Sequence, residues 1–129
     1  MEMNEKIKRE LLSAAAEARE NAYAPYSKFK VGAAALTASG KIYAGANFEN
    51  SAFGAGVCAE RVALGTALAA GEREFMAIVC VGEGSITPCG ICRQALSEFG
   101  EMTVICANPD LTDIREYQLS ELLPVSFSL

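Results

Sequence analysis

Apolar residues near the start of the chain recur at the period of an α-helix, with charged residues on the opposite face. The recurring positions are Ile7, Leu11, Leu12, Ala15 and Ala18. This pattern predicts an amphipathic helix from Ile7 to about Asn21. The segment "APYSKF" ends it, because Pro25 cannot continue a helix.

A hairpin and a second helix are predicted next. In "KVGAAALTASGKIYAGANF", two apolar stretches flank the pair Ser39-Gly40, whose residue types favour a tight turn between strands. The run "CAERVALGTALAA" is rich in helix-forming residues and stops at Gly71, the residue type favoured just past a helix end.

The second half of the chain alternates apolar strands with a helix. "FMAIVCVG" and "MTVICAN" are short apolar runs of the kind found in buried strands, and "CGICRQALSEFG" between them is helical in pattern. Strand, helix and strand at this spacing imply parallel pairing through a right-handed crossover. An edge strand is expected around Ile114 to Gln118, followed by a helical turn that ends near Pro124.

These elements predict a three-layer α/β/α sandwich with a mixed five-stranded sheet and helices on both faces. A chain of 129 residues is long enough to bury one core and too short for two. Because the sequence contains no internal repeat and no linker, residues 1–129 are expected to form a single domain.

The charge balance narrows the class of partner. A net charge of −5 with no basic stripe argues against nucleic acid, because non-specific affinity for DNA or RNA comes mostly from Lys and Arg neutralising phosphates. A small neutral substrate suits the chain better. No segment approaches the roughly 18 apolar residues of a membrane span, and the charged N-terminus does not resemble a signal peptide. We expect a cytoplasmic protein with no membrane partner.

Three of the five cysteines form a candidate zinc site. The motif Pro88-Cys89-Gly90-Ile91-Cys92 begins a predicted helix, and Cys58 begins the previous one. In parallel α/β sheets such junctions lie at the carboxyl ends of neighbouring strands, where ligand sites form, so Cys58 can meet Cys89 and Cys92. Three thiolates leave the fourth position of a tetrahedral zinc open, which is typical of catalytic zinc with a bound, acidified water. One Zn²⁺ per chain is expected.

Nearby charged residues complete the predicted chemistry. Helix N-termini at the cysteines offset the negative charge of the thiolates. Arg61 and Arg93, each just after a cysteine, are expected to donate hydrogen bonds to the sulfurs from outside the ligand set. The chain contains no histidine. Glu60 lies on the first turn of the helix that starts at Cys58. We therefore expect Glu60 to supply the proton transfers that histidine usually performs.

The motifs "CAE" and "PCGIC" resemble those of zinc nucleoside deaminases, which combine His or Cys, x, Glu with Pro-Cys-x-x-Cys. The stretches "AYAPYSKFKVGAA", "NFEN", "CAER", "PCGICRQ" and "ELLP..F" are similar, in order, to small three-cysteine cytidine deaminases over nearly the whole chain. The resemblance implies a zinc-dependent homotetramer that converts cytidine and 2′-deoxycytidine to uridine and 2′-deoxyuridine, with release of ammonia, in pyrimidine salvage.

The resemblance also implies roles for individual residues. Cys58, Cys89 and Cys92 would hold zinc. Glu60 would protonate N3 of the cytosine ring and pass a proton to the leaving amine, and the amide of Ala59 would hold the base carbonyl.

The same resemblance implies which residues would contact the sugar and the open face of the base. Asn47 and Glu49 would bind the ribose 3′-hydroxyl, and Phe29 would pack against the nucleoside. Phe127 would stack on the base bound by an adjacent chain, so that active sites are shared between subunits. Phe53 stands where relatives commonly have tyrosine, which removes one hydrogen-bond donor near the 5′ end of the sugar.

Other interpretations fit less of the sequence. Cys89 and Cys92 could form a redox pair, but the third cysteine and the adjacent carboxylate argue against it. A purely structural zinc module would need a fourth ligand, and the remaining Cys80 and Cys106 lie mid-strand, where cysteine packs as a small hydrophobe. The acidic charge disfavours a nucleic-acid editing enzyme. The runner-up is a deaminase of a modified cytosine nucleoside, such as a nucleoside antibiotic.

Overall fold

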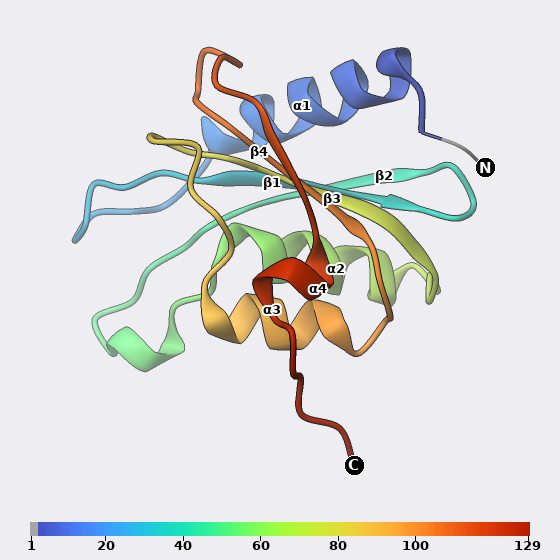
Figure 1. Ribbon diagram of the computed structural model, residues 1–129. Coiled ribbons are helices and arrows are strands. Elements are labelled where there is room, and N and C mark those ends of the chain that lie inside the picture. The colour runs from blue at the N-terminus through green and yellow to red at the C-terminus, as the bar shows by residue number, and fades with distance from the viewer. Residues whose placement is uncertain (1–2) are drawn as a thin grey trace.

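A mixed five-stranded sheet forms the middle layer of the computed structural model, which describes residues 3–129 (Figure 1). The strands are β1 (Gly32–Thr37), β2 (Ile42–Ala46), β3 (Phe75–Val81), β4 (Thr103–Ala107) and β5 (Arg115–Gln118). The helices are α1 (Glu5–Arg19), α2 (Ala59–Ala69), α3 (Gly90–Ser97) and α4 (Leu119–Leu122), with a 3₁₀ turn at Phe53–Ala55. The predicted elements are therefore all present, although residues 1 and 2 of the expected domain lie outside the described part.

The strand order is β2-β1-β3-β4-β5. β1 pairs antiparallel with β2 and with β3, and β5 pairs antiparallel with β4. Only β3 and β4 pair parallel, across α3. This is the predicted mixed sheet, with the hairpin at one edge and the strand-helix-strand unit at the other.

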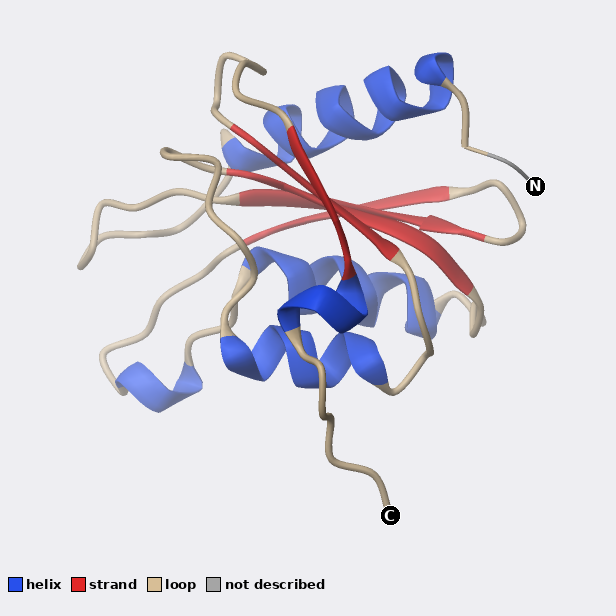
Figure 2. Ribbon diagram, viewed as in Figure 1, coloured by secondary structure: helices blue, strands red, loops and turns tan. Residues whose placement is uncertain are grey.

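Helices cover both faces of the sheet and make three layers (Figure 2). α1 lies on one face, and α2, α3 and α4 lie on the other. Strand residues alternate between the two cores: in β4, Cys106 packs toward α2 and α3, while Ile105 packs toward α1. Cys80 and Cys106 are register partners with no exposed surface, as expected for cysteines that pack as small hydrophobes.

Gly45 allows β2 to lie directly on the first turns of α2. A Cβ atom at this position would come within 2.5 Å of the amide nitrogen of Ala63 and 2.9 Å of the carbonyl oxygen of Ala59. Because no real side chain tolerates such distances, only glycine fits. This close approach fixes the N-terminal end of α2, where the predicted site residues begin.

The strands that lead to the two cysteine-bearing helices are not neighbours. Cys58 follows β2 through the loop 47–57, and Cys89 follows β3 through the loop 82–88, but β1 lies between these strands. Since β1 is antiparallel to both, β2 and β3 run in the same direction. The carboxyl ends of β2 and β3 therefore lie on the same side of the sheet, where the strands end. Among residues 3–129, every helix is too short or too polar to cross a membrane.

Candidate metal centre and active-site cleft

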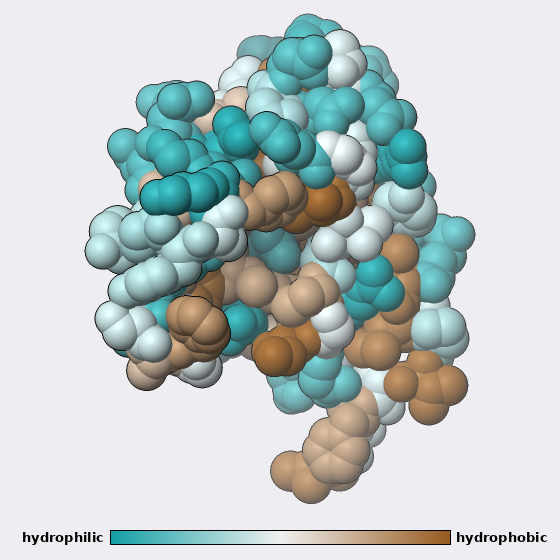
Figure 3. Space-filling model, turned by 90° about the vertical axis from the view of Figure 1, so that its left-hand side faces the viewer, coloured by the Kyte–Doolittle hydropathy of each residue, from teal (hydrophilic) through white to brown (hydrophobic). Residues whose placement is uncertain are grey.

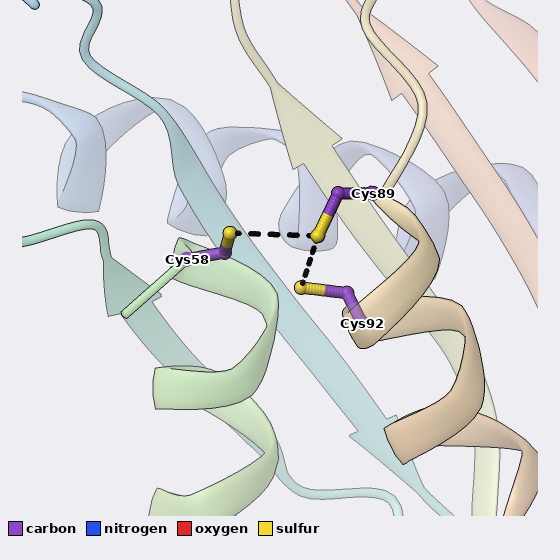
Figure 4. A group of neighbouring side chains, drawn as sticks. All are labelled: Cys58, Cys89 and Cys92. Atoms are coloured by element: carbon purple, nitrogen blue, oxygen red, sulfur yellow. Dashed lines mark hydrogen bonds between the residues drawn. The ribbon is translucent and has the colours of Figure 1, made fainter. Parts of the chain in front are cut away.

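Three cysteine sulfurs meet where α2 and α3 begin (Figure 4). Cys58 caps the N-terminus of α2, Cys89 caps that of α3, and Cys92 lies in the first turn of α3. The sulfur of Cys89 lies 3.8 Å from that of Cys58 and 3.6 Å from that of Cys92. All three sulfurs are within 4.8 Å of one another.

This donor set fits zinc. Tetrahedral ligands at the usual Zn–S distance of about 2.3 Å have sulfurs roughly 3.8 Å apart, close to the separations found here. Within the described residues the cluster contains three ligands rather than four, and Cys58 and Cys89 also line a cleft. The fourth position of a bound ion would thus be open toward the cleft, as in catalytic zinc sites rather than closed structural ones.

The cluster favours thiolate at Cys58. The neighbouring Cys92 thiol, followed by the Arg61 guanidinium, lowers the pKa of Cys58 to about 5. The deprotonated form of cysteine is the one that binds metal. The helix N-terminus at Cys58 acts in the same direction, because its free amide groups carry partial positive charge.

Glu60 lies in the first turn of α2 and lines the same cleft. Its side chain is almost entirely buried, with the residue only 3% exposed. Burial raises the pKa of Glu60, and the nearby charge of Cys58 raises it further. A raised pKa brings a carboxyl group closer to the range in which it both accepts and returns a proton, which a general acid-base catalyst requires.

The two arginines expected to donate to the sulfurs have different surroundings. Arg61 lies against the cluster, where Cys92 and then Cys58 raise its pKa. Its Nε is buried without a hydrogen-bond partner among the described residues. Arg93 differs from the expectation. Its hydrogen bonds run to the carbonyl oxygen of Pro88, the hydroxyl of Thr87 and the carbonyl oxygen of Leu122.

Arg93 thus braces the backbone before Cys89 rather than a sulfur. The reason is geometric: the guanidinium donates 2.7 Å to the Pro88 carbonyl oxygen, 2.9 Å to the Thr87 hydroxyl and 2.8 Å to the Leu122 carbonyl oxygen. These three bonds use one donor from each nitrogen of its planar fork. The residue holds the loop that presents Cys89.

A cleft of about 280 Å³ opens beside the cysteines. Its lining comprises Ser27, Phe29, Val31, Asn47, Glu49, Cys58, Ala59, Glu60, Ile86, Thr87 and Cys89. The cleft therefore brings together seven of the residues selected from sequence. Cys92, Arg61 and Arg93 are not among its lining residues. Phe127 is not among the lining residues. It is 69% exposed and belongs to the C-terminal tail, residues 123–129. This tail projects from the body of the molecule (Figures 1 and 3).

Asn47 and Glu49 each hold a segment of the opposite wall. The Asn47 side chain accepts from the amide of Val31 and donates to the carbonyl oxygen of Phe29, at 2.8 and 2.9 Å. Glu49 accepts from the amides of Tyr26 and Ser27, both at 3.0 Å, and from the Ser27 hydroxyl. The Ser27 hydroxyl lowers the pKa of Glu49 more than any other group. Both polar residues therefore position the segment 26–31 as well as facing the cleft.

Sequence reasoning missed Ser27, Val31, Ile86 and Thr87 as lining residues. Ser27 has a local signal, because a serine two residues after a proline is typical of a turn. Its hydroxyl accepts from the Phe29 amide at 3.0 Å, two residues later. Ile86 and Thr87 immediately precede the Pro-Cys motif but carry no distinguishing pattern.

A second cavity of about 370 Å³ shares Ser27 and Glu49 with the cleft. Tyr26 and Phe53 meet edge to face in its wall, with ring centroids 5.9 Å apart. The Tyr26 hydroxyl lies 2.8 Å from that of Ser51. Phe53 itself is 80% exposed, so its ring is free to contact another molecule.

A comparison with known protein families agrees with this geometry. Residues 5–108 match the model of the cytidine and deoxycytidylate deaminase zinc-binding region, which is most of the chain. The chain belongs to this family. It is 48% identical over 122 residues to a cytidine deaminase of Sporosarcina psychrophila, covering 92% of this chain and 89% of the relative. A probable cytidine deaminase of Dictyostelium discoideum is 41% identical and is matched over 98% of this chain and 87% of the relative.

Solved structures of the family have the same fold. The cytidine deaminase of Burkholderia pseudomallei matches with a TM-score of 0.88 and 47% identity, covering 97% of this chain and 100% of that chain. The cytidine deaminase of Mycobacterium tuberculosis matches with a TM-score of 0.82 and 36% identity, over 95% and 98%. The sandwich with a mixed five-stranded sheet is thus the fold of this family.

Proposed function

We propose that this chain is a zinc-dependent hydrolase that deaminates free cytidine and 2′-deoxycytidine to uridine and 2′-deoxyuridine, releasing ammonia. The observation that carries the proposal is the cleft beside the metal centre, where Cys58, Cys89 and the buried carboxyl group of Glu60 line one cavity and Cys92 completes the thiol cluster. Cytidine deaminases at up to 48% identity over most of the chain support the same substrate class.

The assignment of the metal follows from the donor set. Cys58, Cys89 and Cys92 would hold one Zn²⁺ per chain, since a tri-thiolate site with one open position suits catalytic zinc. A bound zinc ion supplies the activation of water as a nucleophile at neutral pH.

Glu60 is the proposed proton carrier. Hydrolysis adds the oxygen of water to C4 of the base, breaks the bond from C4 to the exocyclic amine and leaves a carbonyl. The water must lose its protons, while N3 and then the leaving amine must gain them. Glu60 lies on the cleft wall with a raised pKa, so it is suited to take the two protons of the water one at a time and deliver the first to N3 and the second to the leaving amine.

The remaining cleft residues are proposed to hold the nucleoside. The amide of Ala59, at the start of α2, is suited to donate to the base carbonyl, because the first amides of a helix have no partner within it. Phe29 offers an apolar surface. Asn47 and Glu49 are proposed to bind the 3′-hydroxyl with the hydrogen-bonding capacity that their loop contacts leave free.

The open side of the cleft supports a shared site. In the residues described here, the cleft lining supplies the single aromatic ring of Phe29, and a buried pyrimidine needs an apolar surface on its other face. We propose a homotetramer of single-domain chains in which Phe127 of one chain covers the base bound by its neighbour. The exposure of Phe127 in the projecting tail supports this arrangement.

The proposal extends to the cellular setting. All five cysteines are free thiols, which suits a reducing compartment such as the cytoplasm. The reaction belongs to the salvage of pyrimidine nucleosides.

The deciding experiment follows ammonia release and absorbance loss on a panel of cytidine, 2′-deoxycytidine, a base-modified cytosine nucleoside, cytosine and cytidine monophosphate. We expect turnover of the two nucleosides and little on the base or the nucleotide, because the acidic cleft disfavours phosphate. Efficient turnover of the nucleotide alone, or of a base-modified nucleoside in preference to cytidine, would contradict the proposal.

A further inference from the structure

The end of the chain is fastened to α3 although it lies outside the core. Gln94, in the second turn of α3, donates from Nε2 to the carbonyl oxygen of Phe127 over 2.9 Å. The Phe127 amide donates back to Oε1 of Gln94 over 3.0 Å. One side-chain amide thus pairs with both backbone hydrogen-bonding groups of a single residue, much as a neighbouring strand would.

This contact orders the backbone of Phe127 without burying its ring. The ring is 69% exposed, and Val125 and Leu129 on either side of it are exposed as well. Ordering a chain terminus costs conformational entropy, and an exposed ring returns little hydrophobic free energy to its own chain. A fixed backbone beneath a free ring suits a side chain that packs against a surface outside its own chain.

The start of the tail is held by the same helix. Arg93 precedes Gln94 and donates to the carbonyl oxygen of Leu122, at the end of α4, over 2.8 Å. Its guanidinium also donates to the carbonyl oxygen of Pro88 in the loop before Cys89. The base and the tip of the tail are therefore tied to consecutive residues of the helix that carries two of the cysteines.

We propose that Gln94 is a positioning residue for the reaction: it sets the backbone of Phe127 so that the ring meets the base bound in an adjacent chain. The inference rests on the shared site of the proposed function and adds the group that aims the shared ring. Gln94 is neither a lining residue of the cleft nor a member of the cysteine cluster, so it would act only through Phe127.

Two substitutions separate the hydrogen bonds from packing. Gln94→Met keeps the length of the side chain and removes both bonds, whereas Gln94→Glu keeps an acceptor for the Phe127 amide and loses the donor. For the methionine variant we expect KM for cytidine to rise about five- to tenfold, as two lost hydrogen bonds would produce, with kcat within twofold. The glutamate variant should fall between it and the wild type. Zinc content should stay at one per chain in both.

A structural readout and a control accompany the kinetics. Hydrogen exchange of the Phe127 amide should be slowed in the wild type and accelerated in Gln94→Met, because the bond to Oε1 protects it. Ser128→Ala, which changes a tail side chain without a hydrogen bond in residues 3–129, should leave exchange and KM unchanged.

The double variant distinguishes the possible outcomes. If Gln94 acts through Phe127, adding Gln94→Met to Phe127→Ala should raise KM no further. Additive effects, or zinc loss in both single Gln94 variants, would overturn the inference by showing an independent or structural role. A normal KM in Gln94→Met beside a raised KM in Phe127→Ala would overturn it while the shared site stands. A normal KM in Phe127→Ala would remove the shared site itself.

Discussion

The side-chain amide of Asn47 holds the backbone of Phe29, donating to its carbonyl oxygen over 2.9 Å. The same side chain accepts from the amide of Val31 over 2.8 Å, so it joins the end of β2 to the segment that enters β1. A residue proposed to bind the ribose is thus also a structural residue of the cleft wall. Any test of its role in binding must separate these two contributions.

Substrates that lack the 3′-hydroxyl make this separation. Asn47→Ala should lower kcat/KM on cytidine more than on 3′-deoxycytidine, because removal of a partner for a buried hydroxyl costs roughly 1–3 kcal/mol. Glu49→Ala should behave in the same way. The ratio of kcat/KM on the two substrates is the measurement. Equal losses on both would mean that the residues act only by holding the segment 26–31.

Cys89→Ala should abolish stoichiometric zinc binding, since two thiols do not make a tight site. Metal analysis of purified protein checks this. Cys80→Ala provides the matched control, because Cys80 is a fully buried cysteine of β3 outside the cluster. It should keep one zinc per chain at some cost in stability. A full equivalent of zinc in Cys89→Ala would contradict the ligand assignment.

Glu60→Gln should retain the fold and zinc but lose most of its activity. The amide keeps the shape of the side chain and removes the proton carrier, and loss of general acid-base catalysis lowers rates by about 10²–10⁴. Single-turnover kinetics with zinc-loaded protein gives the comparison. Turnover within tenfold of the wild type would show that another group moves the protons.

Gly45→Ala should destabilise the chain by roughly 1–3 kcal/mol, because its Cβ would overlap the backbone of α2 at Ala59 and Ala63. Gly65→Ala is the matched control: Gly65 lies in α2, the helix against which Gly45 packs, with open space at its Cβ position. Since alanine favours helices over glycine, that variant should be neutral or more stable. Urea unfolding measures both, and similar effects in the two variants would disprove the role of close packing.

Mixing two impaired variants tests whether sites are shared. Phe127→Ala chains lack the proposed covering ring, and Glu60→Gln chains lack the proton carrier. After subunit exchange, hybrid oligomers should contain some sites with an intact glutamate and an intact neighbouring phenylalanine, and so recover activity that neither parent has. No recovery despite exchange demonstrated by mass spectrometry, or full activity in a stable monomer, would show that each chain completes its own site.

The parts of the fold and site that were predictable have local signals. Cys58 and Cys89 could be placed at helix starts because each is followed directly by a run of helix-forming residues. Glu60 could be linked to the cluster because it lies two residues from Cys58 on the same first turn. The pairing of β3 with β4 followed from a general rule of chain connection.

The parts that could not be predicted depend on contacts between distant segments. Arg93 binds Leu122, 29 residues away, and nothing in the sequence near either residue indicates that contact. Glu49 reaches back 22 residues to Ser27. The insertion of β1 between β2 and β3 also depends on tertiary pairing, since the sequence alone suggested that the strands before the two cysteine helices were adjacent.

The position of β1 couples the metal site to the sheet. Cys58 and Cys89 follow β2 and β3, which lie on either side of β1, so the tri-thiol cluster is a non-local structure that depends on the pairing of β1 along both of its edges. A fragment that contains either cysteine helix with its own strand lacks the cluster. A metal that binds only the folded form stabilises that form. Zinc affinity in this chain therefore depends on the pairing of β1 with both β2 and β3.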